Sequence, residues 1–428
     1  MRLGIDIGTT KTAAVIYDWG HQELLAAKSV NNNAGTRGRD ADKIIQATFD
    51  AIAGLPADLR RQVTAIGMTG QMHGIICWSG GRHSDFENWQ STRTVDTGTL
   101  AKIKQLPGCE GLFAGAGFAT LAIPEFRAGW QHCGTIMDYF GAILCNTLDS
   151  QGKIEASNAA SWGLWNFTKR DWNYDAVTRL GIPREMLPQV CEVDIVGSLD
   201  AEMANKLGLP TGIPVITPVG DNPAAILGSK GNVETDLFIT IGTGAQLAFV
   251  PKNPEKNFSA IGYDKRPFPG LDIMFVKAPL CGGKSLEVLA KFIAETCDEF
   301  GAEVSLPKIY DTIAEANSVA DDTLKVCTSF AGERHDVNLQ GSVTGISQDN
   351  FTFRKVCRAW NEGLIETLIG GLPQSVINAR KRIVVNGNAI RRSPALLQIL
   401  KERLPRMEIV LPDSKEEAAC GSTLFAKA

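Results

Sequence analysis

Two short turns of the chain have the composition of a phosphate-binding site. The first, Gly8-Thr9-Thr10-Lys11, divides the apolar runs of Leu3–Asp18, and the second, Gly242-Thr243-Gly244, divides those of Asp236–Pro251. Apolar runs on both sides of a tight glycine turn predict a β-hairpin. Backbone N–H and hydroxyl groups at two such turns can bind a polyphosphate from both sides, and Lys11 adds a positive charge. The residues predicted to contact phosphate are Thr9, Thr10, Lys11, Gly242 and Thr243.

An aspartate near the middle of the chain stands at a strand-to-helix junction. Asp221 follows the strand-like run 215–219 and Gly220, and it precedes Asn222-Pro223 and an apolar helix start. Proline suits the first position of a helix, so we expect the helix to begin at Pro223. A carboxylate at this junction can take the proton of an alcohol that accepts a phosphoryl group, a reaction dominated by positioning and charge neutralisation. The alternative is that Asp221 caps the helix.

A second carboxylate, Asp6, ends the first predicted strand just before the first turn. Beside a triphosphate it can hold Mg²⁺ through water, because Mg²⁺ gives up its water ligands reluctantly. The alternative is that Asp6 anchors the hairpin turn by hydrogen bonds.

A histidine lies between two glycines at the end of another strand-like run. The segment reads Gly70-Gln71-Met72-His73-Gly74, in a chain with only five histidines. One interpretation is a core histidine beside a turn. The other is a ligand site, in which His73 donates or accepts a hydrogen bond, Met72 gives an apolar surface and the glycines let the backbone approach the ligand.

A different nucleotide site is suggested by Ala278–Ser285, which reads APLCGGKS between a strand-like and a helix-like run. It ends in Gly283-Lys284-Ser285 like a P-loop, although Ala278 stands where that motif has its first glycine. No apolar strand ending in a metal-binding Asp follows it, as a P-loop enzyme requires. The favoured interpretation is that the glycines let this helix start approach a nucleotide held by the two hairpins.

Composition excludes several classes of function. The chain has 428 residues, enough for two domains, and a net charge of -4, which argues against a nucleic-acid binder. Its ten cysteines include no C-x-x-C pair, so we expect reduced thiols. No apolar run is long enough for a membrane helix and no signal peptide begins the chain. We therefore expect a cytoplasmic protein that binds small molecules, with neither a nucleic-acid nor a membrane partner.

Strands and helices alternate along the chain. Helices are expected at residues 41–54, 354–369 and near the C-terminus, and strands at residues 63–68 and around 382–386. Gly, Ser and Asn cluster at residues 230–236, just before the second hairpin, which predicts a domain boundary there. The predicted domains are residues 1–230 and 231–428.

These motifs together resemble a known family. Duplicated Gly-Thr hairpins resemble the actin-like ATPase fold, and with the segments 70–74, 220–225 and 385–389 they resemble the FGGY carbohydrate kinases over essentially the whole chain. The segment 88–94 resembles the Trp-Gln-Asp-x-Arg motif of the sedoheptulokinases in that family, with Ser91 in place of Asp. The segment 157–173 resembles their Asn-Ala-Ala-Ser-Trp-Gly stretch and is the most specific match.

The resemblance implies an α/β fold of two actin-like (ribonuclease H-like) ATPase domains with an inter-domain active-site cleft. It also implies ATP and Mg²⁺ as cofactors and phosphorylation of a ketose at its terminal hydroxyl, with sedoheptulose giving sedoheptulose 7-phosphate. A xylulokinase or another ketose kinase of the family is the near alternative. A P-loop NTPase and a non-catalytic sugar sensor are the more distant ones.

The resemblance also implies a role for individual residues. Asp221 is expected to be the general base and Asp6 to hold the metal ion. The expected ketose contacts are Met72, His73, Trp89, Asn158, Asp221 and Asn222. The additional nucleotide contacts are Gly283, Gly387 and Asn388, in turns that lie late in the chain.

Overall fold

The structure is a computed structural model that describes residues 1–35, 39–242, 244–251, 259, 262–316, 323–333, 336, 338–412 and 416–426. The chain forms two compact units. Unit 1 comprises Met1–Lys230, Pro267–Asp272 and Ser414–Ala428, and unit 2 comprises Gly231–Arg266 and Ile273–Asp413. The predicted second domain, 231–428, therefore includes two short segments that belong to unit 1.

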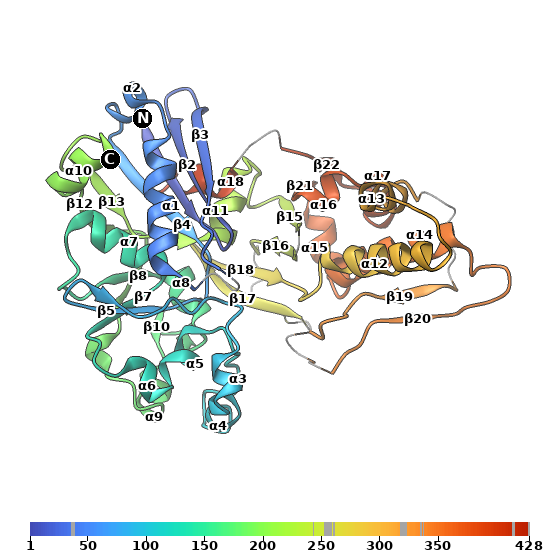
Figure 1. The fold of residues 1–428 in the computed structure, drawn as a ribbon, viewed down its shortest axis with the longest axis horizontal. Coiled ribbons are helices and arrows are strands. Elements are labelled where there is room, and N and C mark those ends of the chain that lie inside the picture. The colour runs from blue at the N-terminus through green and yellow to red at the C-terminus, as the bar shows by residue number, and fades with distance from the viewer. Residues whose placement is uncertain are drawn as a thin grey trace. The chain divides into compact units, whose positions relative to one another are not determined.

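A seven-stranded sheet forms the centre of unit 1, and the first hairpin lies within it (Figure 1). The order is β12-β13-β4-β1-β2-β3, and β14 also pairs with β4. The hairpin strands are antiparallel, whereas β1, β4 and β13 run parallel. The bounds are β1 Arg2–Ile7, β2 Lys11–Asp18, β3 Glu23–Asn31, β4 Ala65–Gly70, β12 Ile195–Ser198, β13 Pro214–Ile216 and β14 Val219–Gly220.

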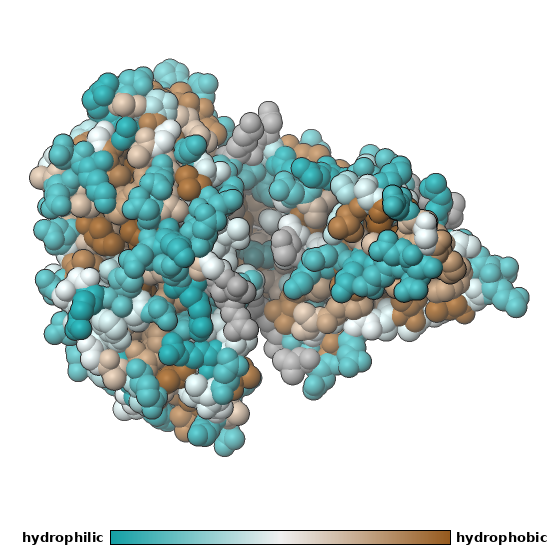
Figure 2. All heavy atoms as spheres, in the orientation of Figure 1, coloured by the Kyte–Doolittle hydropathy of each residue, from teal (hydrophilic) through white to brown (hydrophobic). Residues whose placement is uncertain are grey.

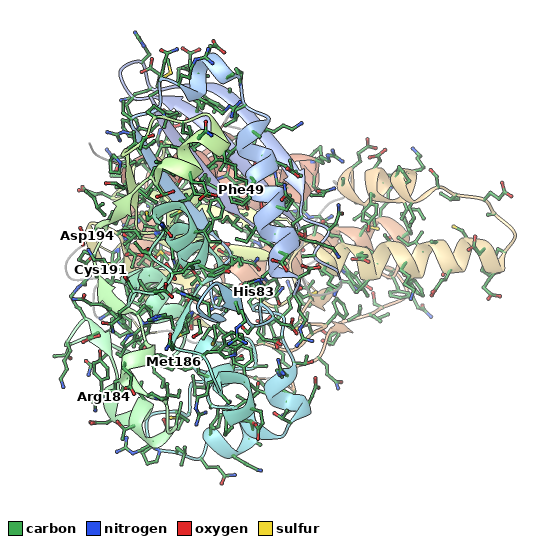
Figure 3. The ribbon with its side chains drawn as sticks, turned by 60° about the vertical axis from the view of Figure 1, so that its left-hand side comes forward. Phe49, His83, Arg184, Met186, Cys191 and Asp194 are labelled. Carbon is green, nitrogen blue, oxygen red and sulfur yellow. The ribbon has the colours of Figure 1, made fainter. Side chains whose placement is uncertain are left out.

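Helices cover both faces of this sheet. Leu3, Ile5 and Ile7 share an apolar core with helices α1 (Ala41–Ala53) and α7 (Ile136–Cys145). In that core the ring of Phe49, labelled in Figure 3, meets the ring of Phe140 edge-on with the ring centroids 5.4 Å apart. The alternate residue Gly4 faces helix α18 (Glu417–Ser422), where a Cβ atom would lie 2.1 Å from the Ala419 carbonyl oxygen. The backbone of α18 therefore lies directly on the sheet.

The rest of unit 1 has a core of its own. Trp162 stacks on Trp172 at 5.6 Å, and Phe118 meets both rings edge-on. A small sheet, β6-β5-β7, lies beside this core. The strands are β5 Ile76–Ser79, β6 Arg82–His83, β7 His132–Gly134, β8 Lys153–Glu155, β9 Trp165–Asn166, β10 Asp171–Trp172 and β11 Gln189–Cys191. The remaining helices are α2 Ala57–Arg60, α3 Arg93–Asp96, α4 Thr99–Ile103, α5 Gly117–Leu121, α6 Pro124–Arg127, α8 Ala156–Ser161, α9 Tyr174–Arg179, the 3₁₀ helix η1 Arg184–Met186, α10 Ala201–Leu207 and α11 Asp221–Gly228.

Unit 2 repeats the strand arrangement of unit 1. Its sheet has the order β17-β18-β16-β15-β21-β22, in which β15 is antiparallel to β16 and parallel to β21. This matches the pairing of β1 with β2 and β4, so the two hairpins occupy equivalent places. The strands are β15 Asp236–Ile241, β16 Ala245–Phe249, β17 Tyr263–Phe268, β18 Leu271–Lys277, β19 Lys325–Cys327, β20 Ser342–Thr344, β21 Arg382–Asn386 and β22 Glu408–Val410.

The helices of unit 2 share one apolar core with alternate residues of its sheet. Leu237, Ile239 and Ile241 of β15 lie in this core together with Leu289 of α12 and Leu364 of α14. The helices are α12 Lys284–Glu299, α13 Leu306–Ala314, α14 Phe353–Ile369, α15 Gln374–Ala379, α16 Asn388–Arg391 and α17 Pro394–Arg403.

Most of the predicted elements are confirmed, with one correction at the junction between β14 and α11. Both hairpins form, as do the helices predicted at residues 41–54 and 354–369. The helix expected to begin at Pro223 begins instead at Asp221, so Pro223 is its third residue. Proline still fits, because the first turn of a helix needs no N–H from it.

The surface of the two units is mainly hydrophilic where Figure 2 shows it, with scattered apolar side chains. Such scattered apolar exposure is ordinary for a folded protein. Among the residues that the structure describes, no helix is both long and apolar enough to cross a membrane.

Asp138 gives the stability of unit 1 a dependence on pH. The Thr135 N–H and hydroxyl donate to its Oδ2 at 2.8 and 2.7 Å, and burial raises the pKa of Asp138 from 3.8 to about 7. The folded state therefore binds a proton that the unfolded state has lost, so the contribution of Asp138 to stability is present below pH 4 and is lost as the pH rises through about 7. Each pKa unit of difference corresponds to about 1.4 kcal/mol.

We expect Asp138→Asn to stabilise the protein progressively relative to wild type between pH 4 and 7, because the amide keeps the shape but never ionises. Thermal unfolding at several pH values measures this effect. The same substitution at the partly exposed cap Asp200 is the control. Parallel stability curves for wild type and Asp138→Asn would contradict the prediction.

Candidate active site

The first hairpin turn is held by side-chain amides of unit 1. The Asn32 amide donates to the carbonyl oxygens of Gly8 and Thr9 at 3.2 and 3.0 Å, and the Gln71 amide donates to Gly8 at 3.4 Å. The Thr9 hydroxyl donates to Gln71 Oε1 at 3.2 Å and accepts from Trp89 Nε1 at 3.0 Å. These bonds fix the turn with its carbonyl groups directed at protein donors. Such a turn is a rigid support for an anion.

Lys11, at the end of the turn, forms an ion pair that sequence analysis missed. Its ammonium donates to both carboxylate oxygens of Glu416, at 2.7 and 2.9 Å. Glu416 lies 405 residues away in the chain, immediately before α18. No local pattern connects the two, so only the packing of α18 on the sheet reveals the contact.

The carboxyl ends of three strands meet at one edge of the sheet in unit 1. Ile7 of β1 pairs with Gly70 of β4, and Gly220 of β14 pairs with the same Gly70. Asp221 directly follows β14, and Met72-His73 follow β4 after one residue, Gln71, so all three lie at the edge where β1 ends beside Asp6. This edge is where open α/β sheets bind their ligands.

Three carboxylates influence one another at this edge. Burial of Asp6, followed by the negative charges of Asp221 and Glu416, raises the pKa of Asp6 to about 7, although Lys11 opposes the shift. Among the described residues, no group of three or more His, Cys, Asp or Glu side chains is arranged to hold a metal ion unaided. A cation at Asp6 would therefore need ligands from a substrate, as Mg²⁺ usually takes from phosphates.

Asp221 does not occupy the cap position of its helix. The N-cap of α11 is Gly220, and its first residue is Asp221, whose Oδ1 accepts from the N–H of Asn222 at 2.7 Å. Both Asp221 and Asn222 are partly exposed. Met72 packs against the same junction, since a Cβ atom at Gly220 would lie 2.6 Å from Met72 Sδ. Asp221, expected to be the base, and Met72, expected to contact the sugar, therefore lie at the same junction.

His73 is fixed in a left-handed conformation by helix α8. Its φ is 74°, which is uncommon for a residue other than glycine and costs about 1–3 kcal/mol. The His73 N–H donates to Ser161 Oγ at 3.0 Å, and His73 Nδ1 lies 2.8 Å from the Ser161 carbonyl oxygen. Because a carbonyl only accepts, Nδ1 carries a proton, and in the neutral form of the ring the lone pair is on Nε2. Strain of this kind is typical of a functional site.

The glycines around His73 allow close packing within the protein itself. This corrects the prediction that they let a ligand approach the backbone. A Cβ atom at Gly70 would lie 2.4 Å from the carbonyl oxygen of Ile7. A Cβ atom at Gly74 would lie 2.6 Å from the ring of Phe86. Both glycines are required because strand β1 and an aromatic ring occupy the space.

The other predicted sugar contacts differ in exposure. Trp89 is 42% exposed beside the first turn, as an apolar wall for a ligand must be. Asn158 is fully buried, and its amide donates to the carbonyl oxygen of Pro218 at 2.8 Å. Trp165, which lies in the segment 157–173, is partly buried and packs against the core of unit 1.

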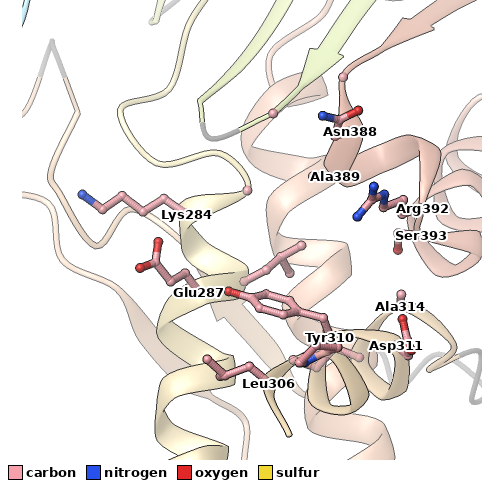
Figure 4. A pocket seen from close by; sticks show the side chains of 16 residues that line it. Lys284, Glu287, Leu306, Tyr310, Asp311, Ala314, Asn388, Ala389, Arg392 and Ser393 are labelled. Carbon is pink, nitrogen blue, oxygen red and sulfur yellow. The ribbon is translucent and has the colours of Figure 1, made fainter. Parts of the chain in front are cut away.

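Unit 2 contains a pocket of about 790 Å³ (Figure 4). Of the predicted nucleotide contacts, Gly242, Gly283, Gly387 and Asn388 line it, and Thr243 lies outside the described residues. Apart from Lys284, which was considered only as part of a P-loop, sequence analysis did not single out the other polar side chains that line it. They include Glu287, Tyr310, Asp311, Arg392 and Ser393. Figure 4 shows the Tyr310 ring inside the pocket with its hydroxyl end towards Glu287. Burial, and then the negative charge of Glu287, raise the pKa of Tyr310.

Beside this pocket three glycine-containing turns pack so closely that their backbones are in contact. A Cβ atom at Gly283 would lie 2.1 Å from the carbonyl oxygen of Gly242, and one at Gly282 would lie 2.1 Å from Gly244. Gly387 has a φ of 98°, and a Cβ atom there would lie 2.3 Å from the carbonyl oxygen of Ile241. The start of α12 therefore rests on the second hairpin turn.

The P-loop alternative does not fit this geometry. The Ser285 side chain is buried and its hydroxyl donates to the carbonyl oxygen of Gly282 at 2.8 Å, so it is not placed to bind a metal ion. The preceding strand, β18, is antiparallel to β16, whereas a P-loop follows a strand of a parallel sheet.

Comparison with known proteins agrees with this arrangement. The profile described as the N-terminal domain of the FGGY family of carbohydrate kinases matches residues 1–105 and 122–228. Sedoheptulokinase from Mus musculus is 28% identical over 94% of this chain and 92% of its own length.

Solved structures share the fold of the whole chain. Xylulose kinase from Rhodospirillum rubrum has a TM-score of 0.82 at 19% identity, over 99% of this chain and 89% of that protein. Plasmodium falciparum glycerol kinase with ADP has a TM-score of 0.77 at 16% identity, over 99% and 88%. The duplicated hairpin sheets are therefore those of the two-domain actin-like fold. The chain belongs to the FGGY family of carbohydrate kinases, and it is a carbohydrate kinase.

Proposed function

We propose that the enzyme transfers the γ-phosphoryl group of ATP to the terminal hydroxyl of a ketose, with sedoheptulose as the substrate and sedoheptulose 7-phosphate as the product. The observation that carries the proposal is the meeting of Met72, His73 and Asp221 at one edge of the sheet in unit 1. The resemblance of residues 157–173 to sedoheptulokinases and the mouse relative support the choice of sugar.

In this proposal the ketose binds beside His73. With a proton on Nδ1, the neutral form of the ring can accept a hydrogen bond from a sugar hydroxyl at Nε2. Met72 and Trp89 offer apolar surfaces to the carbon chain of the sugar, and Asn222 contacts a further hydroxyl.

Asp221 acts as the general base. Its carboxylate accepts the proton of the terminal hydroxyl while that oxygen forms a bond to the γ-phosphorus. The bond between the γ-phosphorus and the oxygen bridging to the β-phosphate breaks, and ADP leaves. The partial exposure of Asp221 at the first position of α11 lets it reach a bound hydroxyl.

ATP binding is assigned to both hairpin turns. Backbone groups of the first turn, with Thr9 and Thr10, and of the second turn, with Gly242 and Thr243, contact phosphates. Lys11 contributes its charge once a phosphate replaces Glu416 as its partner. The pocket of unit 2 accepts the nucleoside, with the Tyr310 ring as an apolar surface and Asn388 and Arg392 as polar contacts.

Asp6 fits a role as ligand of a divalent cation. Its carboxyl lies among negative charges that raise its pKa, and a cation there would relieve their repulsion. Mg²⁺ bound with ATP neutralises the charge that develops on the phosphates during transfer.

A panel of ketoses tests the substrate. We expect ADP release with ATP and Mg²⁺ to show the highest kcat/KM for sedoheptulose, ahead of xylulose and ribulose. Xylulose is the near alternative because both sugars offer the same keto end to Met72 and His73. A higher kcat/KM for xylulose would identify the enzyme as a xylulokinase. Binding of a ketose with no ADP release for any sugar would instead indicate a sensor.

A further inference from the structure

The short helix α8 contacts both parts of the sugar site. Two of its serines, Ser157 and Ser161, are four residues apart and therefore lie on one face of the helix. Ser157 bonds to the residue before Asp221, and Ser161 bonds to His73. These side chains are almost completely buried.

The first contact is a relay of hydrogen bonds that ends at a buried carboxylate. The Gly220 N–H donates to Ser157 Oγ at 3.0 Å. The Ser157 hydroxyl in turn donates to Glu155 Oε2, which also accepts the Ser157 N–H at 2.9 Å. Glu155 lies on β8 opposite Cys191 of β11, labelled in Figure 3, so the strand pair fixes its position. Because the Ser157 hydroxyl donates its hydrogen to Glu155, its oxygen lone pair is directed at the Gly220 N–H.

The second contact orients the histidine. Ser161 Oγ accepts the His73 N–H, and the Ser161 hydroxyl donates to the Asn158 carbonyl oxygen at 2.6 Å. The Ser161 carbonyl oxygen accepts from His73 Nδ1, which fixes the tautomer of the ring. The side-chain hydroxyl and the backbone carbonyl of Ser161 therefore both accept hydrogen bonds from His73 and hold it in place.

A third contact comes from the middle of the helix. The Asn158 amide donates to the carbonyl oxygen of Pro218, which precedes β14 and Asp221. Its Oδ1 is buried with no hydrogen-bond partner among the described residues. Burying this oxygen without a partner costs about 1–3 kcal/mol of folding free energy. Asn158 therefore holds Pro218 through its amide N–H at a cost in stability.

We propose that α8 is a positioning element that sets the location of Asp221, through Ser157 and Asn158, relative to that of His73, through Ser161. The inference rests on the proposed roles of Asp221 as base and His73 as sugar contact. The hydroxyl that accepts the phosphoryl group must lie in line with ATP and within reach of its base, and a misplacement of about 1 Å can lower the rate about 10²-fold. A rigid helix that binds both segments prevents that misplacement.

The two serines are expected to affect different kinetic constants. Ser157→Ala removes the acceptor of the Gly220 N–H, so Asp221 shifts and kcat falls by about 10- to 100-fold, with KM for the ketose changed less than about 3-fold. Ser161→Ala removes one of two bonds to His73, so KM for the ketose rises by about 3- to 10-fold with kcat nearly unchanged. Steady-state kinetics with the preferred ketose measures both.

Two further variants separate positioning from folding. Glu155→Gln keeps a carbonyl oxygen for the Ser157 hydroxyl, so we expect it to retain kcat within about 3-fold, whereas Glu155→Ala should resemble Ser157→Ala. Ser422→Ala is the matched control, because that buried hydroxyl donates only to the Ala419 carbonyl of its own helix in the described structure. It should leave both constants unchanged. Thermal unfolding of each variant reports any general loss of stability.

The outcomes distinguish this inference from the proposed function. If Asp221→Asn abolishes turnover but Ser157→Ala lowers only the Tm and leaves kcat at the wild-type value, α8 is merely structural and the inference fails alone. The same holds if Ser157→Ala and Ser161→Ala change the same constant equally. If Asp221→Asn itself turns over normally, the proposed function fails.

Discussion

Replacement of Asp221 by asparagine is expected to lower kcat by about 10²–10⁴-fold, the range that general-base catalysis typically contributes. The amide keeps the shape of the side chain and can still accept from the Asn222 N–H, so α11 should begin as before. It cannot accept the proton of the sugar hydroxyl. The affinities for sugar and nucleotide should therefore change far less than the rate.

Steady-state kinetics gives the rate, and calorimetric titration of the ketose gives the affinity. The matched control is Asp200→Asn, because Asp200 is the N-cap of α10 and its carboxylate accepts the Glu202 N–H at 2.8 Å. Asparagine caps a helix about as well as aspartate, so this variant should keep the wild-type kcat. Near wild-type turnover of Asp221→Asn would show that Asp221 too has only a local structural role.

Replacement of Asp6 by asparagine is expected to lower kcat/KM for ATP with Mg²⁺ by about 10²-fold or more. The physical reason is that the amide removes the negative charge on which the cation depends. Ketose affinity should change little, because Met72 and His73 follow β4 rather than β1. Asp18→Asn, at the far end of the same hairpin, is the control.

The raised pKa of Asp6 gives this prediction a second measurement. Below a pH of about 7, Asp6 holds a proton in the absence of a cation, so the proton competes with Mg²⁺. The apparent affinity of the wild-type enzyme for Mg²⁺ should therefore fall as the pH decreases through about 7, and the affinity of Asp6→Asn should lose this dependence. An Asp6→Asn enzyme with an unchanged Mg²⁺ requirement would leave Asp6 as an anchor of the turn.

Short-range patterns in the sequence were enough to predict the elements that carry the site. Alternating apolar runs around Gly8–Lys11 and Gly242–Gly244 predicted both hairpins, because a tight turn with flanking apolar strands depends on neighbouring residues only. Their repetition predicted the duplicated sheet, and the motifs at His73 and Asp221 indicated the family. The start of α11 was wrong by two residues, because proline tolerates several positions in the first helical turn.

The contacts that complete the site depended on the tertiary structure. Glu416 reaches Lys11 only because the last helix packs on the first sheet, 405 residues along the chain. The purpose of Gly70 and Gly74 was misjudged, since the sequence shows that a side chain is missing but not which atoms take its place.

The sequence by itself determined which elements form and which chemistry their turns can perform, since both depend on residues a few positions apart. Ser157 and Ser161 appeared only as part of a recognisable stretch. Their bonds to Gly220 and His73 link segments 63 and 88 residues away. The burial of whole apolar faces of helices and sheets decides which segments pack together. The polar groups buried in that packing must then form hydrogen bonds with one another, although no local sequence pattern connects them. Only the tertiary structure decided them.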